Sequence, residues 1–368
     1  MIHFINPKEI AMPNIRHKRS ILKKFSTLID NGKYINAEYV HKFEAEFGRY
    51  CKKRYCVSVN SGTDALILSL RNLGIRPGDE VLVPSVSFMA TALAPLLMGA
   101  RLRFIDIDIH TYNIDYELIP TSITKKTSAI IPVHWAGRPL EQKKLKKMAK
   151  KTGLAVVEDA APAVGAFTEE GPVGSSGNHV IFSFFPTKNL SCIGDGGTIL
   201  VSKKNDYERL RLLRNFGRVA RESFRIIGQN SRLDELQAMI LLERLKSLDV
   251  ENNKRRHLAR LYDRYLDKSI IRPKTDSVSG HVYHLYVILV PSKRDRIQKA
   301  LKKRGIETTA HYRIPIHKHL IKMGFSEFKK SVLKNTDAYA NRCLSLPMYP
   351  SLKEEEVYTV AKEINKLI

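Results

Sequence analysis

The sequence has few cysteines and no long apolar segment, and both deficits narrow what the protein can be. Its four cysteines, Cys51, Cys56, Cys192 and Cys343, have neither the paired spacing of a zinc site nor the density of a disulfide framework. We therefore expect free thiols in a reducing compartment and no bound metal. The longest apolar run covers 13 residues, 88–100, and contains a proline, so it is too short to cross a bilayer.

We expect no secretory signal, because no apolar segment follows the basic residues near the start of the sequence. We expect a cytoplasmic protein with no membrane segment. Acidic residues are scarce: 37 Asp and Glu against 62 Lys and Arg give a formal charge of +25. Such a charge attracts polyanions, but the basic residues are spread over helical patterns without a recognition module. No nucleic-acid partner is predicted; a lysine-rich proteome or attraction of a phosphorylated small molecule explains the charge equally well.

Short apolar strands alternate with helices over much of the chain. We predict strands in residues 56–62, 80–85, 101–108, 128–135, 154–161, 179–185 and 196–202. Their apolar residues occupy consecutive rather than alternating positions, which is typical of strands buried on both faces. The sequence therefore predicts an α/β fold with a large, mostly parallel, seven-stranded sheet covered by helices.

A chain of 368 residues exceeds the usual size of a single core, so we expect two structural units. Amphipathic helices are predicted at residues 15–30 and 37–50, ahead of the first strand. Residues 281–290 alternate like a strand on a half-covered sheet, between helical segments. We place a boundary near residue 250: residues 1–250 form the large domain with its N-terminal helices, and residues 251–368 form a small α+β domain.

One lysine stands out in the segment HVIFSFFPTKNLSCIGDGGTILVS, residues 179–202. Lys188 interrupts a long apolar passage bounded by glycines, whereas most lysines of this chain belong to solvated helical faces. On this segment alone, a turn cap and a reactive amine are equally good interpretations.

Other polar residues at strand ends favour the reactive amine. Ser61, Gly62 and Thr63 follow a strand and open a helix, which creates an anion site as readily as an ordinary cap. Asp159 ends another strand, where parallel sheets bind their ligands, although it could also cap the next helix. Ser183 lies within a third strand, shortly before the lysine.

These groups match the needs of pyridoxal phosphate. Its phosphate requires N–H donors and hydroxyls, its pyridine nitrogen requires an anion, and its aldehyde requires a lysine for a Schiff base. The same lysine, once a substrate amine displaces it, can act as general acid and base if its pKa is lowered.

The sequence resembles the DegT/DnrJ/EryC1/StrS family of sugar aminotransferases from about Lys33 to the C-terminus. The resemblance rests on ordered segments: VNSGTDALILSL, GDEVLVPSVSFMATA, IIPVHWAGRP, VVEDAA, FSFFPTKNLSCIGDGG and GQNSRLDELQA, followed by HYRIPIH and SLPMYPSL. It implies a fold-type-I, aspartate-aminotransferase-like architecture and a homodimer with active sites at the subunit interface. It also implies transfer of an amino group, usually from glutamate, to a keto sugar attached to a nucleotide, in the biosynthesis of a surface polysaccharide or glycoside.

The resemblance assigns roles to individual residues. Lys188 would form the Schiff base and Asp159 would face the pyridine nitrogen. Ser61, Gly62, Thr63 and Ser183 would hold the phosphate, Phe88 would stack on the ring, and Asn230 would reach the phosphate of the neighbouring subunit's cofactor. Taken singly, Phe88 could be a core aromatic, Ser183 a buried hydroxyl and Asn230 a helix cap.

Candidate contacts to the sugar are less defined. We expect them from His134, Trp135, His311 and Tyr312. Two departures from the family's pattern bear on the site. Pro162 stands where the family usually has Gln or His, which can hydrogen-bond the ring hydroxyl of the cofactor, and residues 33–40 replace a turn containing glycine and proline.

Alternative functions remain open at this point. Family members that remove sugar hydroxyls replace the lysine with histidine, so Lys188 argues against that reaction. An aminotransferase of an amino-cyclitol precursor fits the same motifs. A non-catalytic relative that binds pyridoxal phosphate or a polyanion as a regulator is encouraged only by the charge and by Pro162.

Overall fold

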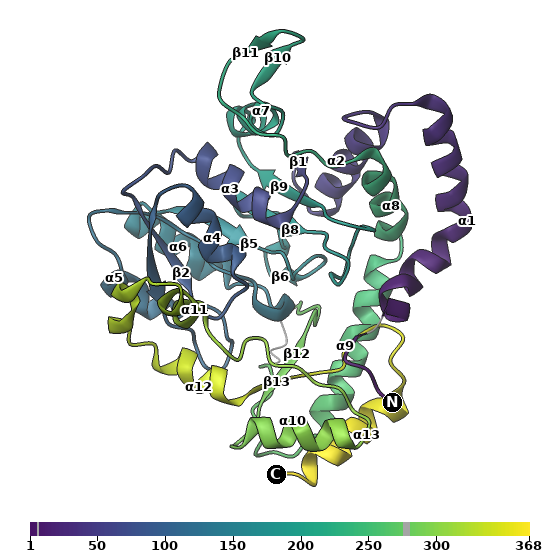
Figure 1. The fold of residues 1–368 in the computed structure, drawn as a ribbon, viewed down its shortest axis with the longest axis vertical. Helices are drawn as coiled ribbons and strands as arrows, with labels where there is room; N and C mark the ends of the chain where they lie inside the picture. Colours follow the sequence, from purple (N-terminus) through teal and green to yellow (C-terminus); the bar gives the residue numbers. More distant parts are fainter. Residues whose placement is uncertain (6, 275–279) are drawn as a thin grey trace.

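A seven-stranded sheet forms the centre of the structure, a computed structural model that describes residues 1–5, 7–274 and 280–368. Its strands, in spatial order, are β1 (Tyr55–Val59), β9 (Gly197–Val201), β8 (His179–Ser183), β5 (Ala155–Asp159), β4 (Thr127–Ile130), β2 (Glu80–Pro84) and β3 (Arg101–Ile105). β9 is antiparallel to both of its neighbours, and the remaining pairs are parallel. Each predicted strand contributes one strand to this sheet, which confirms the predicted fold class (Figure 1).

Both faces of the sheet are covered, which explains the consecutive apolar residues of its strands. On one face, Ile181 and Ile199 pack with helix α3 (Gly62–Asn72). On the other face, Phe182 packs with helix α2 (Glu38–Tyr50). Other helices of this unit are α4 (Ala90–Leu97), α5 (Ile119–Ser122), α6 (Gln142–Thr152), α7 (Lys204–Leu213) and α8 (Glu235–Leu245).

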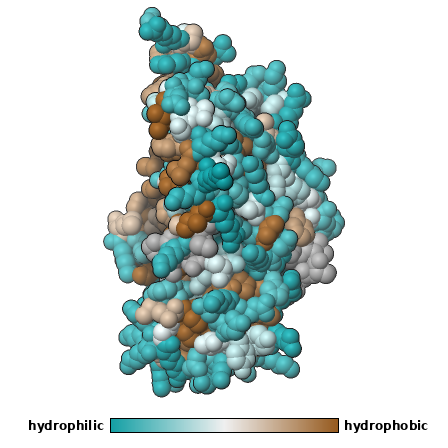
Figure 2. All heavy atoms as spheres, turned by 90° about the vertical axis from the view of Figure 1, so that its right-hand side faces the viewer, coloured by the Kyte–Doolittle hydropathy of each residue, from teal (hydrophilic) through white to brown (hydrophobic). Residues whose placement is uncertain are grey.

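The N-terminal helix α1 (Pro7–Asn31) begins before the predicted start at residue 15 and lies along α8. Pro7 occupies its first position, where the missing N–H costs nothing. Figure 2 faces the side that carries α1, where apolar patches lie among hydrophilic side chains. In the described part of the chain, no helix is long and apolar enough to cross a membrane.

A smaller antiparallel pair organises the C-terminal part. Its elements are α9 (Leu248–Tyr265), β12 (Tyr286–Leu289), α10 (Arg294–Lys303), α11 (Ile316–Lys322), α12 (Lys334–Arg342), β13 (Cys343–Leu346) and α13 (Glu354–Asn365). Residues of α9, β12, β13 and α13 share one core, whereas Ile316 and Leu320 of α11 pack against the large sheet. The domain boundary near residue 250 stays a prediction and falls within α9.

The predicted strand 281–290 is shorter in the structure, where only β12 is extended and paired. The residues before it follow the loop after β4 instead. Val282 N donates to Gly137 O at 3.1 Å, and Leu285 N donates to Ala136 O at 3.3 Å. These bonds bring the C-terminal part to the carboxyl end of the sheet.

Several two- and three-residue strands lie outside the sheets described above. They are β6 (Phe167–Thr168), β7 (Gly171–Pro172), β10 (Arg218–Ala220) and β11 (Ser223–Phe224). The β10–β11 hairpin projects from the body of the molecule (Figure 1). Its side chains are exposed, including the ring of Phe224 at 57%.

The aromatic cluster beneath α2 gives a test of this packing. The ring of Phe47 is fully buried and lies 5.2 Å from Phe182 and 5.5 Å from Phe184, centroid to centroid. Phe47→Ala should lower the free energy of unfolding by about 3–5 kcal/mol, measured by urea titration with circular dichroism. Met323→Ala, at a residue 64% exposed, is the control and should change it by less than about 0.5 kcal/mol. Equal midpoints for the two variants would contradict the packing.

Candidate active site

A cavity of about 470 Å³ lies at the carboxyl ends of β1, β5 and β8. Its polar lining is Ser61, Thr63, Ser87, Asp159, Ser183, Thr187, Lys188, Asp195, His284, His311 and Tyr312, and the rest is largely apolar. Ser61, Asp159 and Ser183 lie at or just after the ends of these strands, and His284 lies in the loop before β12. Parallel sheets place their ligand sites at this edge.

The N-terminus of α3 forms one wall of the cavity. Ser61 is its N-cap, and its Oγ accepts a hydrogen bond from Asp64 N at 3.1 Å. A Cβ at Gly62 would lie 2.7 Å from Ser183 Cβ, and one at Gly197 would lie 2.5 Å from Ser61 O. Only glycine therefore lets the helix end approach β8 and β9 so closely. The wall presents backbone N–H groups and hydroxyls, which suit an anion.

Asp159 ends β5 as a buried carboxylate held by two donors. Its Oδ1 accepts from Ala161 N at 3.1 Å, and its Oδ2 accepts from Thr91 Oγ1 at 3.2 Å. Thr91 Oγ1 in turn lies 2.7 Å from Ser87 Oγ. Burial raises the pKa of Asp159, while the N–H of Ala161 and the charge of Lys188 oppose that rise. The carboxylate is thus fixed in direction and favours a cationic partner.

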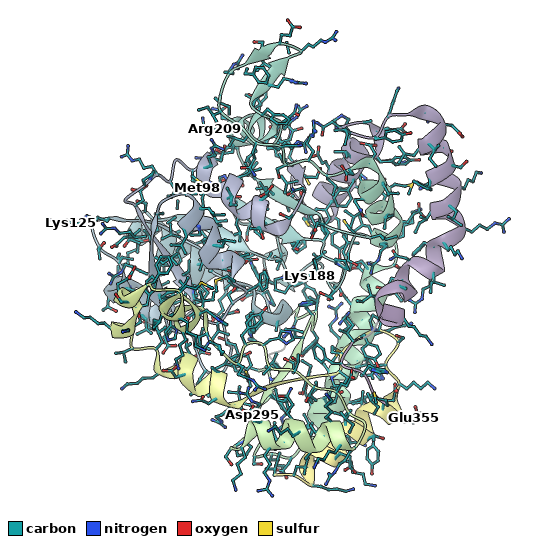
Figure 3. All side chains as sticks on the ribbon, viewed as in Figure 1. Met98, Lys125, Lys188, Arg209, Asp295 and Glu355 are labelled. Carbon is teal, nitrogen blue, oxygen red and sulfur yellow. The ribbon has the colours of Figure 1, made fainter. Side chains whose placement is uncertain are left out.

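Lys188 follows β8 in a tight turn, in which its N–H donates to Phe185 O at 2.8 Å. It lies near the middle of the molecule, whereas Lys125 and Glu355 lie at the periphery (Figure 3). The next residue, Asn189, donates to Asn252 Oδ1 at 2.8 Å and to Val282 O at 3.1 Å, which fixes the turn. Burial lowers the pKa of Lys188 to about 8, although the charge of Asp159 acts in the opposite direction.

Three aromatic rings contact one another at the wall of the cavity. Tyr312 lies 5.5 Å from Trp135 and 6.5 Å from Phe88, centroid to centroid. Trp135 Nε1 donates to Tyr339 OH at 3.0 Å, and Tyr339 OH donates to the backbone oxygen of His311 at 2.7 Å. Burial and the nearby Lys188 lower the pKa of His311 to about 4, so its ring is neutral.

One residue predicted to line the cavity, His134, lies elsewhere, and Asn230 was predicted to serve the neighbouring subunit. His134 is fully buried, accepts a bond from Leu140 N at its Nδ1 (3.2 Å) and donates from Nε2 to Glu158 at 3.0 Å. It supports the loop after β4 and does not line the cavity among the described residues. Asn230 is exposed at the foot of the β10–β11 hairpin, outside the cavity of its own chain.

The structure brings five further polar side chains to the site that the sequence did not single out. Thr91 contacts Asp159, and Ser87, Thr187, Asp195 and His284 line the cavity. A threonine inside an apolar helix and a histidine in an alternating segment carry no local signal of a site. Asp195 is different, because it stands between glycines in the turn GDGG, which is a local signal of a site.

Pyridoxal phosphate fits this set of residues by the chemistry of their groups. The α3 wall is narrowed by glycines and offers N–H donors for a phosphate. Asp159 offers a fixed carboxylate for a pyridine nitrogen, and Lys188 offers an amine that burial keeps partly neutral. When bound, the cofactor would supply the electron-withdrawing ring that amino-group transfer needs.

Comparison with known proteins identifies the family. The sequence pattern of the DegT/DnrJ/EryC1/StrS aminotransferase family matches residues 16–365. A protein of Geobacillus stearothermophilus named pleiotropic regulatory protein is 37% identical, over 94% of each chain. The dTDP-3-amino-3,6-dideoxy-alpha-D-galactopyranose transaminase of Aneurinibacillus thermoaerophilus is 38% identical, over 100% of this chain and 99% of its own.

Solved structures agree with this assignment. The chain superposes on S. venezuelae DesV in complex with a ketimine intermediate with a TM-score of 0.93 and 36% identity, covering 97% of this chain and 96% of that one. NtdA from Bacillus subtilis with bound cofactor PMP gives a TM-score of 0.90 and 30% identity, covering 99% and 83% of the two chains. This chain therefore belongs to the DegT/DnrJ/EryC1/StrS family and is a pyridoxal-phosphate-dependent aminotransferase.

Proposed function

We propose that the chain moves an amino group from L-glutamate to the keto group of a nucleotide-linked sugar through a Schiff base on Lys188. The observation that carries this proposal is a lysine with a pKa of about 8 in the same cavity as a fixed carboxylate and a helix N-terminus. A buried amine of this kind is neutral often enough to attack an aldehyde and basic enough to accept a proton.

Each residue of the cavity has a role in this proposal. Lys188 Nζ would bind the cofactor's aldehyde and, once a substrate amine displaces it, would move a proton between the reacting carbons. Asp159 faces the pyridine nitrogen and keeps it protonated, with Thr91 and Ala161 fixing the direction of the carboxylate. The α3 wall, Ser61 to Thr63 with Ser183, holds the phosphate, and Phe88 stacks on the ring.

The acceptor is proposed from chemistry and from the relatives. The transaminase of A. thermoaerophilus is named for a dTDP-sugar with an amino group at carbon 3, which supports a nucleotide-linked 3-keto sugar here and a role in amino-sugar biosynthesis. Trp135, His311 and Tyr312 are the proposed acceptor contacts, because they line the cavity beside Lys188. His134 acts on this wall only through the loop that it supports.

A regulatory role in addition to amino-group transfer is the second candidate, suggested by the name of the G. stearothermophilus relative. Direct assay of glutamate consumption measures the catalytic function on its own. A panel of keto sugar nucleotides and a keto cyclitol then identifies the acceptor.

We also propose a cytoplasmic homodimer with shared active sites. The support is the position of Asn230, which is exposed at the foot of a projecting hairpin. Phe224 in this hairpin is 57% exposed and Ile227 beyond it is 82% exposed, and apolar side chains this exposed suit a protein interface. A partner seated there would receive Asn230 near its own cofactor phosphate.

The Lys188 assignment predicts a spectroscopic result. The purified protein should absorb visible light through the lysine-bound cofactor, and L-glutamate should bleach that band. Lys188→Ala should remove the band and lower turnover by about 100-fold or more. Lys125→Ala, at an exposed lysine, serves as the control and should change neither. A Lys188→Ala protein that keeps the full band would refute the assignment.

The lowered pKa of Lys188 predicts a pH dependence for loading the cofactor. Only the neutral amine reacts, so the loading rate of the cofactor-free protein should rise about tenfold per pH unit at low pH and level off above about 8. Asp159→Asn removes the charge that raises this pKa, so the midpoint should move to lower pH. A midpoint near 10.5, the ordinary value for lysine, would contradict the burial argument.

Shared sites predict complementation between two defective variants. Lys188→Ala lacks the amine, and Asn230→Ala lacks the group offered to the partner. A mixed dimer has one site with both residues intact, so an equal mixture should reach about a quarter of the wild-type activity after subunit exchange. Activity no higher than the mean of the separate variants would argue against shared sites.

A further inference from the structure

Three segments that are distant in sequence meet at one wall of the cavity. Gly137 has a left-handed backbone with φ 94°, and a Cβ there would lie 3.1 Å from both His284 N and Pro162 O. The loop after β4, the loop after β5 and the approach to β12 are therefore in close contact. Pro162 and His284 both line the cavity at this junction.

One ring nitrogen of His284, at this junction, lacks a hydrogen-bond partner among the described residues. Its Nδ1 is buried and has no hydrogen-bond partner within the described residues. Other histidines nearby are paired: His281 Nδ1 accepts from Tyr283 N at 2.9 Å, and His311 Nδ1 lies 2.9 Å from Ser345 Oγ. A buried nitrogen without a partner is costly, so an imidazole held at a cavity wall in this way is suited to a ligand.

The ring of His284 is neutral at working pH. Burial lowers its pKa well below the ordinary value, and the nearby cations Lys188 and Arg255 act in the same direction. A neutral imidazole has one N–H donor and one acceptor nitrogen. It can therefore donate a hydrogen bond to an anionic oxygen.

The chemistry of the cofactor leaves one polar atom without a proposed partner. The phosphate, the pyridine nitrogen and the aldehyde are assigned to the α3 wall, Asp159 and Lys188. The remaining atom is the phenolic oxygen, which the ring carries next to the aldehyde carbon, on the side away from the phosphate arm. A partner for it must lie near Lys188, and the side chain of Pro162 has no donor. His284 lines the same cavity as Lys188, its backbone meets that of Pro162 at Gly137, and its imidazole can donate a hydrogen bond.

We propose that His284 donates a hydrogen bond to the phenolic oxygen of bound pyridoxal phosphate, at the wall where Pro162 offers no polar group. The inference rests on the proposed placement of the cofactor at Lys188 and Asp159. A donor to this oxygen withdraws charge from it and weakens its hold on the proton of the neighbouring imine nitrogen. His284 would thereby lower the pH at which the cofactor bound to Lys188 loses this proton.

The test is a pH titration of the visible band in the loaded enzyme without substrate. His284→Leu should raise the midpoint by about one pH unit, since a hydrogen bond to a charged group is lost. The dissociation constant of the cofactor, measured by fluorescence titration of the cofactor-free protein, should increase about fivefold or more. His284→Gln retains an N–H donor and should stay close to wild type on both measurements.

Two further variants separate this role from a structural one. Pro162→Gln in the His284→Leu background restores a donor at the same wall and should return the midpoint toward that of the wild type. His311→Leu removes a neutral imidazole that also lines the cavity but is proposed to face the acceptor; its midpoint should not move, while KM for the acceptor should rise.

The outcomes distinguish this inference from the proposed function. A Lys188-dependent band whose midpoint is the same in the wild type and His284→Leu would overturn the role of His284 alone. An equal shift in His284→Leu and His284→Gln would also overturn it, because loss of packing would then explain the effect. A wild-type protein with no Lys188-dependent band would overturn both proposals.

Discussion

The site depends on burying one cation and one anion in the same cavity. Burial raises the pKa of Asp159 and lowers that of Lys188, and each charge opposes the effect of burial on the other. Burial therefore opposes the charged form of both groups, and a charged ligand between them shifts that balance. The hydrogen bonds from Thr91 and Ala161 fix the direction of the carboxylate, so the position of Asp159 sets the orientation of a bound ring.

The fold brings these groups together because its parallel strands end at one edge, while β9 returns antiparallel beside β8. The link from β8 to β9 must therefore turn over the cavity, and Lys188 lies in that turn. Phe184 N donates to Gly196 O at 2.8 Å, and Cys192 N donates to Phe184 O at 2.7 Å, which closes the base of the link. Asn189 ties it to α9 and to the approach to β12, so both parts of the chain hold the lysine.

The sequence predicted the parts of this arrangement that have a local signal. Buried strands show consecutive apolar residues, and Lys188 and Asp159 stand at strand ends, so the sheet and these positions were accessible before the structure. The environment of His134 could not be predicted, because a polar residue after a strand can face the cavity or the loop behind it. In the structure, hydrogen bonds with Glu158 and Leu140 N hold its two ring nitrogens away from the cavity. His284 was missed because its segment alternates like a strand but follows Gly137 instead.

Pro162 affects both the orientation of Asp159 and the polar contacts available to the cofactor ring. It lies in the turn after Asp159, where Ala163 N donates to Ala160 O at 2.8 Å, and a proline narrows the conformations open to such a turn. The loop that orients the carboxylate thus gains rigidity and loses a polar side chain toward the ring. If His284 supplies that contact, the cofactor is held by the C-terminal part of the chain as well as by the sheet.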